Sequence, residues 1–131
     1  MKEPILEIML FTRIHPLSRP RMGRNKGSIY QPKENQQELL VEMSNYKQEN
    51  PISIPVSLEI EICFLRPPKV DIPYPTSNNY GDIDNLSKAI FDAMVTMNIL
   101  ADDNLVIDCM VSKRFNEEDF CKIKIYSADA I

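Results

Sequence analysis

Alternation between apolar and polar positions predicts several β-strands in this chain. The clearest alternation runs from Val56 to Phe64, where apolar residues occupy every second position and Glu59 and Glu61 fall between them. In such a strand the apolar side chains face a core and the polar ones face solvent. Shorter or less regular patterns of the same kind predict the remaining strands, at 5–11, 28–30, 105–115 and 120–126.

Apolar residues that recur every three or four positions predict two α-helices. The first helix is expected at about 33–48, with an apolar stripe made of Leu39, Leu40, Met43 and Tyr46. The second is expected to begin at Asp84, because aspartate is a preferred N-cap residue, and to end near Asn98. Its apolar stripe consists of Leu86, Ala89, Ile90, Ala93, Met94 and Met97. The proline-rich segment 66–80 is expected to be a long loop.

The order of these elements predicts the fold class. Strands, a helix, a strand, a helix and two further strands favour an α/β (α+β) domain with a mixed β-sheet and two main helices. The length of 131 residues suits a single domain, 1–131, with one core. The chain is 44% hydrophobic and 26% charged, which is typical of a globular protein.

Cysteine usage and the N-terminal run bear on the expected location of the protein. The cysteines, Cys63, Cys109 and Cys121, are odd in number and lack Cys-x-x-Cys spacing, so we expect reduced thiols rather than a disulfide framework or a zinc site. The apolar run 5–11 is interrupted by Glu7 and is too short for a signal peptide or a membrane span. We therefore expect a cytoplasmic protein without a membrane partner.

Basic residues concentrate in one segment of an otherwise acidic chain. The formal net charge of −4 by itself argues against a nucleic-acid partner. Between Phe11 and Lys33, however, there is no acidic residue, and the basic residues there are Arg13, Arg19, Arg21, Arg24, Lys26 and Lys33. Arginine side chains bind phosphate oxygens well, so this segment is a candidate DNA-binding arm. From the segment alone, a solvated basic loop is an equally good interpretation.

Two acidic pairs flank the second predicted helix. Asp82 and Asp84 lie at its start, Lys88 follows four residues after Asp84, and Asp102 and Asp103 follow its end. If the helix packs on the following strand, we expect both pairs to reach one pocket. Four carboxylates there would suit Mg²⁺ or Mn²⁺, which prefer oxygen ligands. The alternative is that the first pair caps the helix and the second forms a polar turn.

A carboxylate-bound divalent ion favours phosphodiester hydrolysis over other chemistries. Asp102 is open to three roles: metal ligand, orientation of water, or support of a ligand. Glu59 and Glu61 are a less favoured addition to the metal site. The only glycines, Gly23, Gly27 and Gly81, form no phosphate-binding glycine loop, and the single histidine, His15, has no evident catalytic partner.

The pattern Asp82-x-Asp84-Asn85-Leu86-x-Lys88, followed by Asp102-Asp103, resembles the RusA family of Holliday-junction resolvases. The resemblance implies that Asp82, Asp84 and Asp103 are metal-binding catalytic residues and that Lys88 is catalytic. It also implies a small α/β homodimer that uses Mg²⁺ or Mn²⁺ to make paired nicks in branched DNA such as a four-way junction. Many relatives carry a basic residue directly before the first aspartate, where this chain has Tyr80-Gly81.

We therefore expect a metal-dependent, structure-selective DNA endonuclease that resolves Holliday junctions. Within the same class, the alternative is a nuclease specific for flaps or other branched DNA. From a different class, the alternative is a non-catalytic DNA-binding accessory protein of recombination whose acidic residues are structural. Lys88 favours the enzyme, because catalysis requires a cation near the phosphate and a helix cap does not.

Overall fold

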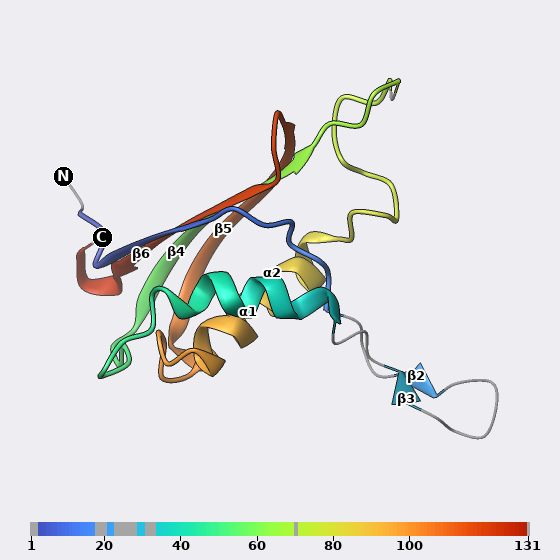
Figure 1. Ribbon diagram of the computed structural model, residues 1–131. Helices are drawn as coiled ribbons and strands as arrows, with labels where there is room; N and C mark the ends of the chain where they lie inside the picture. The colour runs from blue at the N-terminus through green and yellow to red at the C-terminus, as the bar shows by residue number, and fades with distance from the viewer. Residues whose placement is uncertain (1–2, 18–20, 23–28, 31–33, 70, 131) are drawn as a thin grey trace.

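The computed structural model describes residues 3–17, 21–22, 29–30, 34–69 and 71–130 (Figure 1). Its main sheet has four strands in the order β1-β6-β4-β5. The bounds of these strands are β1 Leu6–Leu10, β4 Val56–Leu65, β5 Val106–Asn116 and β6 Phe120–Ser127. A separate two-stranded ribbon pairs β2 (Arg21–Met22) with β3 (Ile29–Tyr30). The helices are α1 Glu34–Ser44 and α2 Ile83–Thr96, with short 3-10 helices η1 Asp103–Leu105 and η2 Ala128–Ala130.

The sheet is mixed, as predicted. β4 runs parallel to β5, whereas β6 is antiparallel to both β1 and β4. Both α-helices lie on one side of this sheet (Figure 1). The predicted alternation is confirmed at the centre of β4, where Ile60 and Ile62 are buried and Glu59 and Glu61 are not. Ser57 and Cys63, which also fall between apolar positions, are buried. The pairing of Ile60 with Ile123 and Val111 continues this apolar layer into both neighbouring strands. The result is the predicted α+β fold.

Helix α1 is shorter than the predicted span of about 33–48. After Ser44 the amides of Asn45 and Tyr46 bond to carbonyls three residues back, which tightens the chain into turns. The hydroxyl of Tyr46 then accepts a bond from the Met9 amide and donates one to the Met9 carbonyl, both at 3.1 Å. This contact with β1 draws Tyr46 out of the helical path, so the helix ends before the apolar stripe does.

Helix α2 begins two positions earlier than predicted. The N-cap is Asp82, not Asp84, and its carboxylate accepts a bond from the Asn85 amide at 2.9 Å. At the other end the helix stops at Thr96, and Asn98 adopts a left-handed conformation with φ of 59°. Among the described residues, no helix has the length and apolar character that crossing a bilayer requires.

The connection from β4 to β5 decides where the two ends of α2 lie. Because these strands are parallel, the chain leaving the end of β4 must return to the start of β5, and α2 makes that return. The N-terminus of α2 therefore lies near the carboxyl ends of both strands. Its C-terminus lies near their starting ends, next to η1.

Candidate active site

The first acidic pair and the lysine are grouped at the N-terminus of α2. Asp82 caps the helix through Oδ1, Asp84 lies in the first turn, and Lys88 follows one turn later. All three side chains are exposed to solvent. A helix N-terminus carries partial positive charge, so acidic side chains are favoured there. The capping interpretation is therefore correct for Asp82, and it leaves the group accessible to a ligand.

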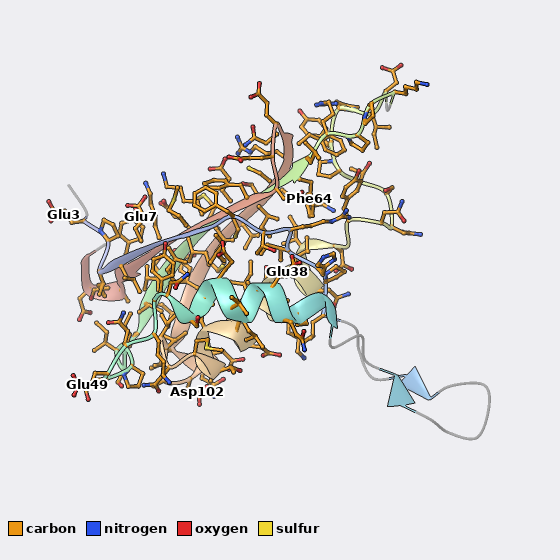
Figure 2. The ribbon with its side chains drawn as sticks, in the orientation of Figure 1. Glu3, Glu7, Glu38, Glu49, Phe64 and Asp102 are labelled. Carbon is orange, nitrogen blue, oxygen red and sulfur yellow. The ribbon has the colours of Figure 1, made fainter. Side chains whose placement is uncertain are left out.

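The second acidic pair lies at the opposite end of α2. Asp102 caps η1 by accepting a bond from the Asn104 amide at 2.9 Å, and Asp103 is the first residue of η1. The 14 residues of α2 correspond to a length of about 21 Å. Figure 2 shows Asp102 below the helices and Phe64 above them, on the sheet. Phe64 packs next to Tyr80, at a centroid distance of 5.0 Å.

The strand register supports the same separation. The Nζ atom of Lys113 donates to the Gly81 carbonyl at 2.7 Å, so this position of β5 lies beside the start of α2. Val106, the first residue of β5, is seven residues earlier, a distance of about 23 Å along an extended strand. The expectation that both acidic pairs share one pocket is therefore wrong for a single chain. Within the described ranges, no three His, Cys, Asp or Glu side chains are grouped so that they could hold a metal ion.

The loop before Asp82 is held by residues from the N-terminal segment. Gly81 has φ of 83°, and a Cβ atom there would lie 2.7 Å from the Pro16 side chain. The amide of Leu17 bonds to the Asn85 carbonyl at 3.1 Å. Only glycine adopts this backbone conformation freely and leaves space for Pro16. The start of α2 is thus fastened to the segment that leads into the basic arm.

An aromatic cluster contains Arg13, one of the predicted DNA contacts. The Arg13 guanidinium lies 5.1 Å from the ring centroid of Tyr80 and 5.4 Å from that of Phe64, and it donates to the Asn79 carbonyl at 2.8 Å. Tyr80 also packs edge-on against Phe115, at 5.4 Å. Arg13 is therefore an anchor for the loop rather than a free phosphate contact, because its head is held by carbonyl and ring partners.

The other predicted basic contacts are less fully described. Arg21 belongs to β2, whereas Arg19, Arg24, Lys26 and Lys33 lie outside the described residues. Their proposed contact with DNA stays a prediction.

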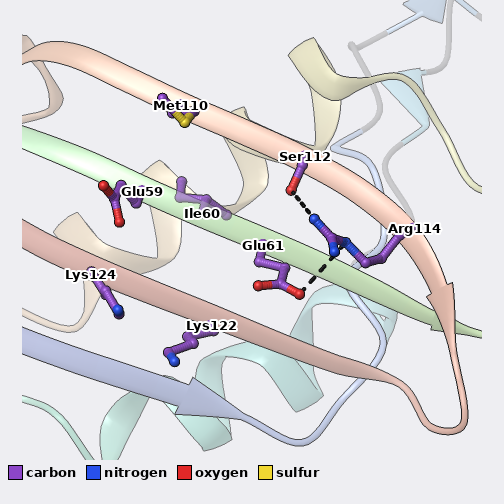
Figure 3. Close-up of a pocket in the computed structure, with 8 residues that line it drawn as sticks. All are labelled: Glu59, Ile60, Glu61, Met110, Ser112, Arg114, Lys122 and Lys124. Atoms are coloured by element: carbon purple, nitrogen blue, oxygen red, sulfur yellow. Dashed lines mark hydrogen bonds and ion pairs between the residues drawn. The ribbon is translucent and has the colours of Figure 1, made fainter.

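The face of the sheet without helices carries Glu59 and Glu61. Together with other residues they line an open hollow of about 380 Å³ (Figure 3). The other lining residues are Ile60, Met110, Ser112, Arg114, Lys122 and Lys124. Glu61 pairs with Arg114 at 3.6 Å. Because α2 packs on the opposite face, Glu59 and Glu61 do not add to the acidic groups at its ends.

The cysteines and the histidine show no sign of catalytic activation. All three thiols are free, as predicted. Burial raises the pKa of Cys109 to about 11 and raises the pKa of Cys121 further, so both thiols stay protonated. Burial, with Arg13 nearby, lowers the pKa of His15. A neutral, partly buried imidazole agrees with a structural role for His15.

One sequence signal for this site was missed. Val111, Lys113 and Phe115 occupy every second position of β5 and face the helix-covered side of the sheet. Val111 and Phe115 pack against the core. A lysine at such an inward position indicates a specific partner, which is the carbonyl before Asp82.

Residues 13–126 match the family model described as endodeoxyribonuclease RusA. The match covers most of the 131-residue chain and includes both acidic pairs, Lys88 and Lys113. No curated protein matches the chain.

Gly81→Ala should destabilise the protein. The substitution places a Cβ atom in contact with Pro16 and forces alanine into a left-handed conformation, so the free energy of unfolding should fall by about 1–3 kcal/mol. Urea denaturation measures the change. Ser77→Ala, at an exposed position of the same loop, is the control and should change stability by less than about 0.5 kcal/mol. Equal stability of the two variants would contradict the proposed constraint at Gly81.

Proposed function

The chain belongs to the RusA family of endodeoxyribonucleases, and we propose that it is a metal-dependent Holliday-junction resolvase that works as a homodimer. The observation that carries the proposal is the family match over 13–126, which contains the spaced aspartates, the lysine and the second acidic pair in their expected order. Their exposure at two helix termini supports a role in binding rather than in the core.

Asp82, Asp84 and Asp103 would hold Mg²⁺ or Mn²⁺. Exposed carboxylates are the ligands that these hard cations prefer. The bound ion would activate water and stabilise the charge of the transition state at phosphorus. Lys88 lies one turn after Asp84 on the same helix face, where its ammonium would stabilise charge on the phosphate. Asp102 supports Asp103 by capping η1, since its Oδ1 accepts the Asn104 amide.

The two acidic pairs are too far apart in one chain to share an ion, so the proposed site is formed by two subunits. A two-fold axis that sets α2 antiparallel to its copy would place the Asp82–Lys88 end of one subunit beside Asp103 of the partner subunit. Two equivalent sites would then lie on one face of the dimer. Resolution of a four-way junction requires two symmetric nicks, which such a pair of sites can make.

Exposed apolar residues near α2 and β5 support this interface. Ile83 and Val95 of α2 are 41% and 37% exposed, and Ile107 of β5 is 62% exposed. Phe91 and Ile107 line a shallow hollow together with Asp103. Burial of this apolar surface between two copies would stabilise the dimer and bring the acidic ends together.

The fold also connects the basic segment to the proposed site. Pro16 and Leu17, which precede that segment, contact Gly81 and Asn85 at the start of α2. DNA held by the arginines and lysines of 18–33 would therefore be held next to Asp82. A local basic surface at this position would allow a protein whose net charge is −4 to bind DNA.

A panel of labelled substrates tests the function. A four-way junction, a flap and a linear duplex are incubated with Mg²⁺ and with EDTA. We expect paired nicks in the junction that require the metal. Preferred cleavage of the flap would favour the flap nuclease. Binding of the junction without cleavage in any divalent metal would favour the accessory protein.

Substitution of the proposed ligands should slow cleavage strongly. Asp82→Asn, Asp84→Asn and Asp103→Asn each remove a charge that holds the metal, and each should lower the single-turnover rate by about 10²-fold or more. Junction affinity should be unchanged or higher, because a negative charge near phosphate is lost. Asp92→Asn, an exposed position in the middle of α2, is the matched control. Wild-type cleavage by Asp103→Asn at sub-saturating Mg²⁺ would refute its assignment.

Two inactive variants should complement each other if the site is shared. Asp84→Asn and Asp103→Asn chains with different tags are co-expressed, and the mixed dimer is purified. One site of that dimer combines both substitutions, and the other is intact, so nicking of one strand should return. If each site belonged to a single chain, both sites of the mixed dimer would be defective. An inactive mixed dimer, or a monomeric mass by sedimentation, would exclude the shared site.

Replacement of arginines in the basic segment should weaken DNA binding. Arg19→Ala, Arg21→Ala and Arg24→Ala together should reduce the dependence of log K on log salt by up to about three, if each contacts a phosphate. The cleavage rate of bound junction should fall less than the affinity. The control is Lys122→Ala with Lys124→Ala, on the sheet face away from α2. An unchanged salt slope in the triple variant would identify the segment as a surface loop.

A further inference from the structure

Lys113 is a charged residue on the face of β5 that packs toward the core. It pairs with the buried Ile62 of β4 and projects to the helix-covered side of the sheet. The residues two positions before and after it, Val111 and Phe115, pack against the core. Partial burial of an ammonium group costs free energy unless a hydrogen-bond acceptor offsets it. The acceptor that Lys113 bonds to therefore indicates the role of this residue.

The acceptor is the backbone carbonyl directly before Asp82. Lys113 Nζ donates to the Gly81 carbonyl at 2.7 Å, a short distance that suits a bond with a charged donor. The left-handed conformation of Gly81 and the contact with Pro16 restrict the peptide from the other side. The direction of the chain into Asp82 is thus set by a strand residue, not by the helix alone.

The charge of Lys113 also suits this location. Asp82 and Asp84 are two carboxylates within one helical turn, and their mutual repulsion disfavours the arrangement before a metal binds. A positive charge held at the adjacent carbonyl would offset part of that repulsion from the sheet side. Lys88 lies one turn further along α2 and is exposed, so the two lysines approach the pair from different elements.

We propose that Lys113 is a positioning residue of the active site, which holds Asp82 in place for metal binding while Lys88 acts on the phosphate. The proposal rests on the function proposed above. It predicts that loss of Lys113 weakens the site for the ion without removing a ligand. Groups that support metal ligands in this way typically contribute 10–100-fold in metal affinity or activity.

Three variants test the role of Lys113. Lys113→Met removes the donor and the charge at similar size, Lys113→Arg keeps both, and Lys124→Met removes a lysine from the open face of the sheet (Figure 3). Mn²⁺ affinity is measured without DNA from the free-ion signal in electron paramagnetic resonance. Junction cleavage is measured in single turnover over a range of Mg²⁺ concentrations, and junction affinity is measured in EDTA.

Lys113→Met should bind Mn²⁺ about 10–100-fold more weakly and need correspondingly more Mg²⁺ for half-maximal cleavage. Its junction affinity in EDTA should match that of the wild type, which a general structural defect would not allow. Lys113→Arg should recover most of the metal affinity, and Lys124→Met should behave as the wild type. If Lys113→Met does not fold, Lys113→Leu, which also lacks a donor and a charge, replaces it in the same comparison.

Wild-type Mn²⁺ affinity in folded Lys113→Met or Lys113→Leu would overturn the proposal. So would equal losses in the Met and Arg variants. A wild-type protein that binds Mn²⁺ but cleaves no branched DNA would refute the proposed function alone, since the metal affinities would still decide the role of Lys113. A wild-type protein that binds no Mn²⁺ at millimolar concentration would refute both.

Discussion

The parallel pairing of β4 with β5 is the constraint on which the proposed site depends. Parallel neighbours require a connection that returns over the full length of the strands, and α2 is that connection. A helix of this length is rigid, so the acidic groups that precede and follow it cannot approach each other within one chain. The site that we propose to be shared in a dimer rests on this distance and on the exposed apolar residues beside α2 and β5.

The start of α2 is where segments distant in sequence meet. Residues 13–17 approach it from the N-terminal side, the loop 79–81 leads into it, and Lys113 supports it from the sheet. Backbone carbonyls hold Arg13, which the charge pattern of the sequence assigned to DNA, and also Lys113. The cations proposed to bind phosphate are therefore a smaller set than the basic residues of the sequence.

The two faces of the sheet differ in a way that agrees with this division. The face under the helices is apolar except where Lys113 reaches the Gly81 carbonyl. On the open face, glutamates of β4 alternate with basic residues of β5 and β6, and the charges offset one another. An acidic protein with a balanced open face needs a local basic surface to bind DNA, and the proposed location of that surface is the segment that follows Leu17.

Local information in the sequence determined most of the elements and the family. The alternation of β4, the stripe of α2 and the order of elements predicted the α+β fold, because burial imposes those periods directly on the residues. The spacing of Asp82, Asp84, Lys88, Asp102 and Asp103 identified the family. Only the tertiary structure decided that the two acidic pairs lie at opposite ends of α2, that Arg13 bonds to the Asn79 carbonyl and that Lys113 bonds to the Gly81 carbonyl. These facts depend on strand direction, register and contacts between distant residues, which the period of a single segment does not encode.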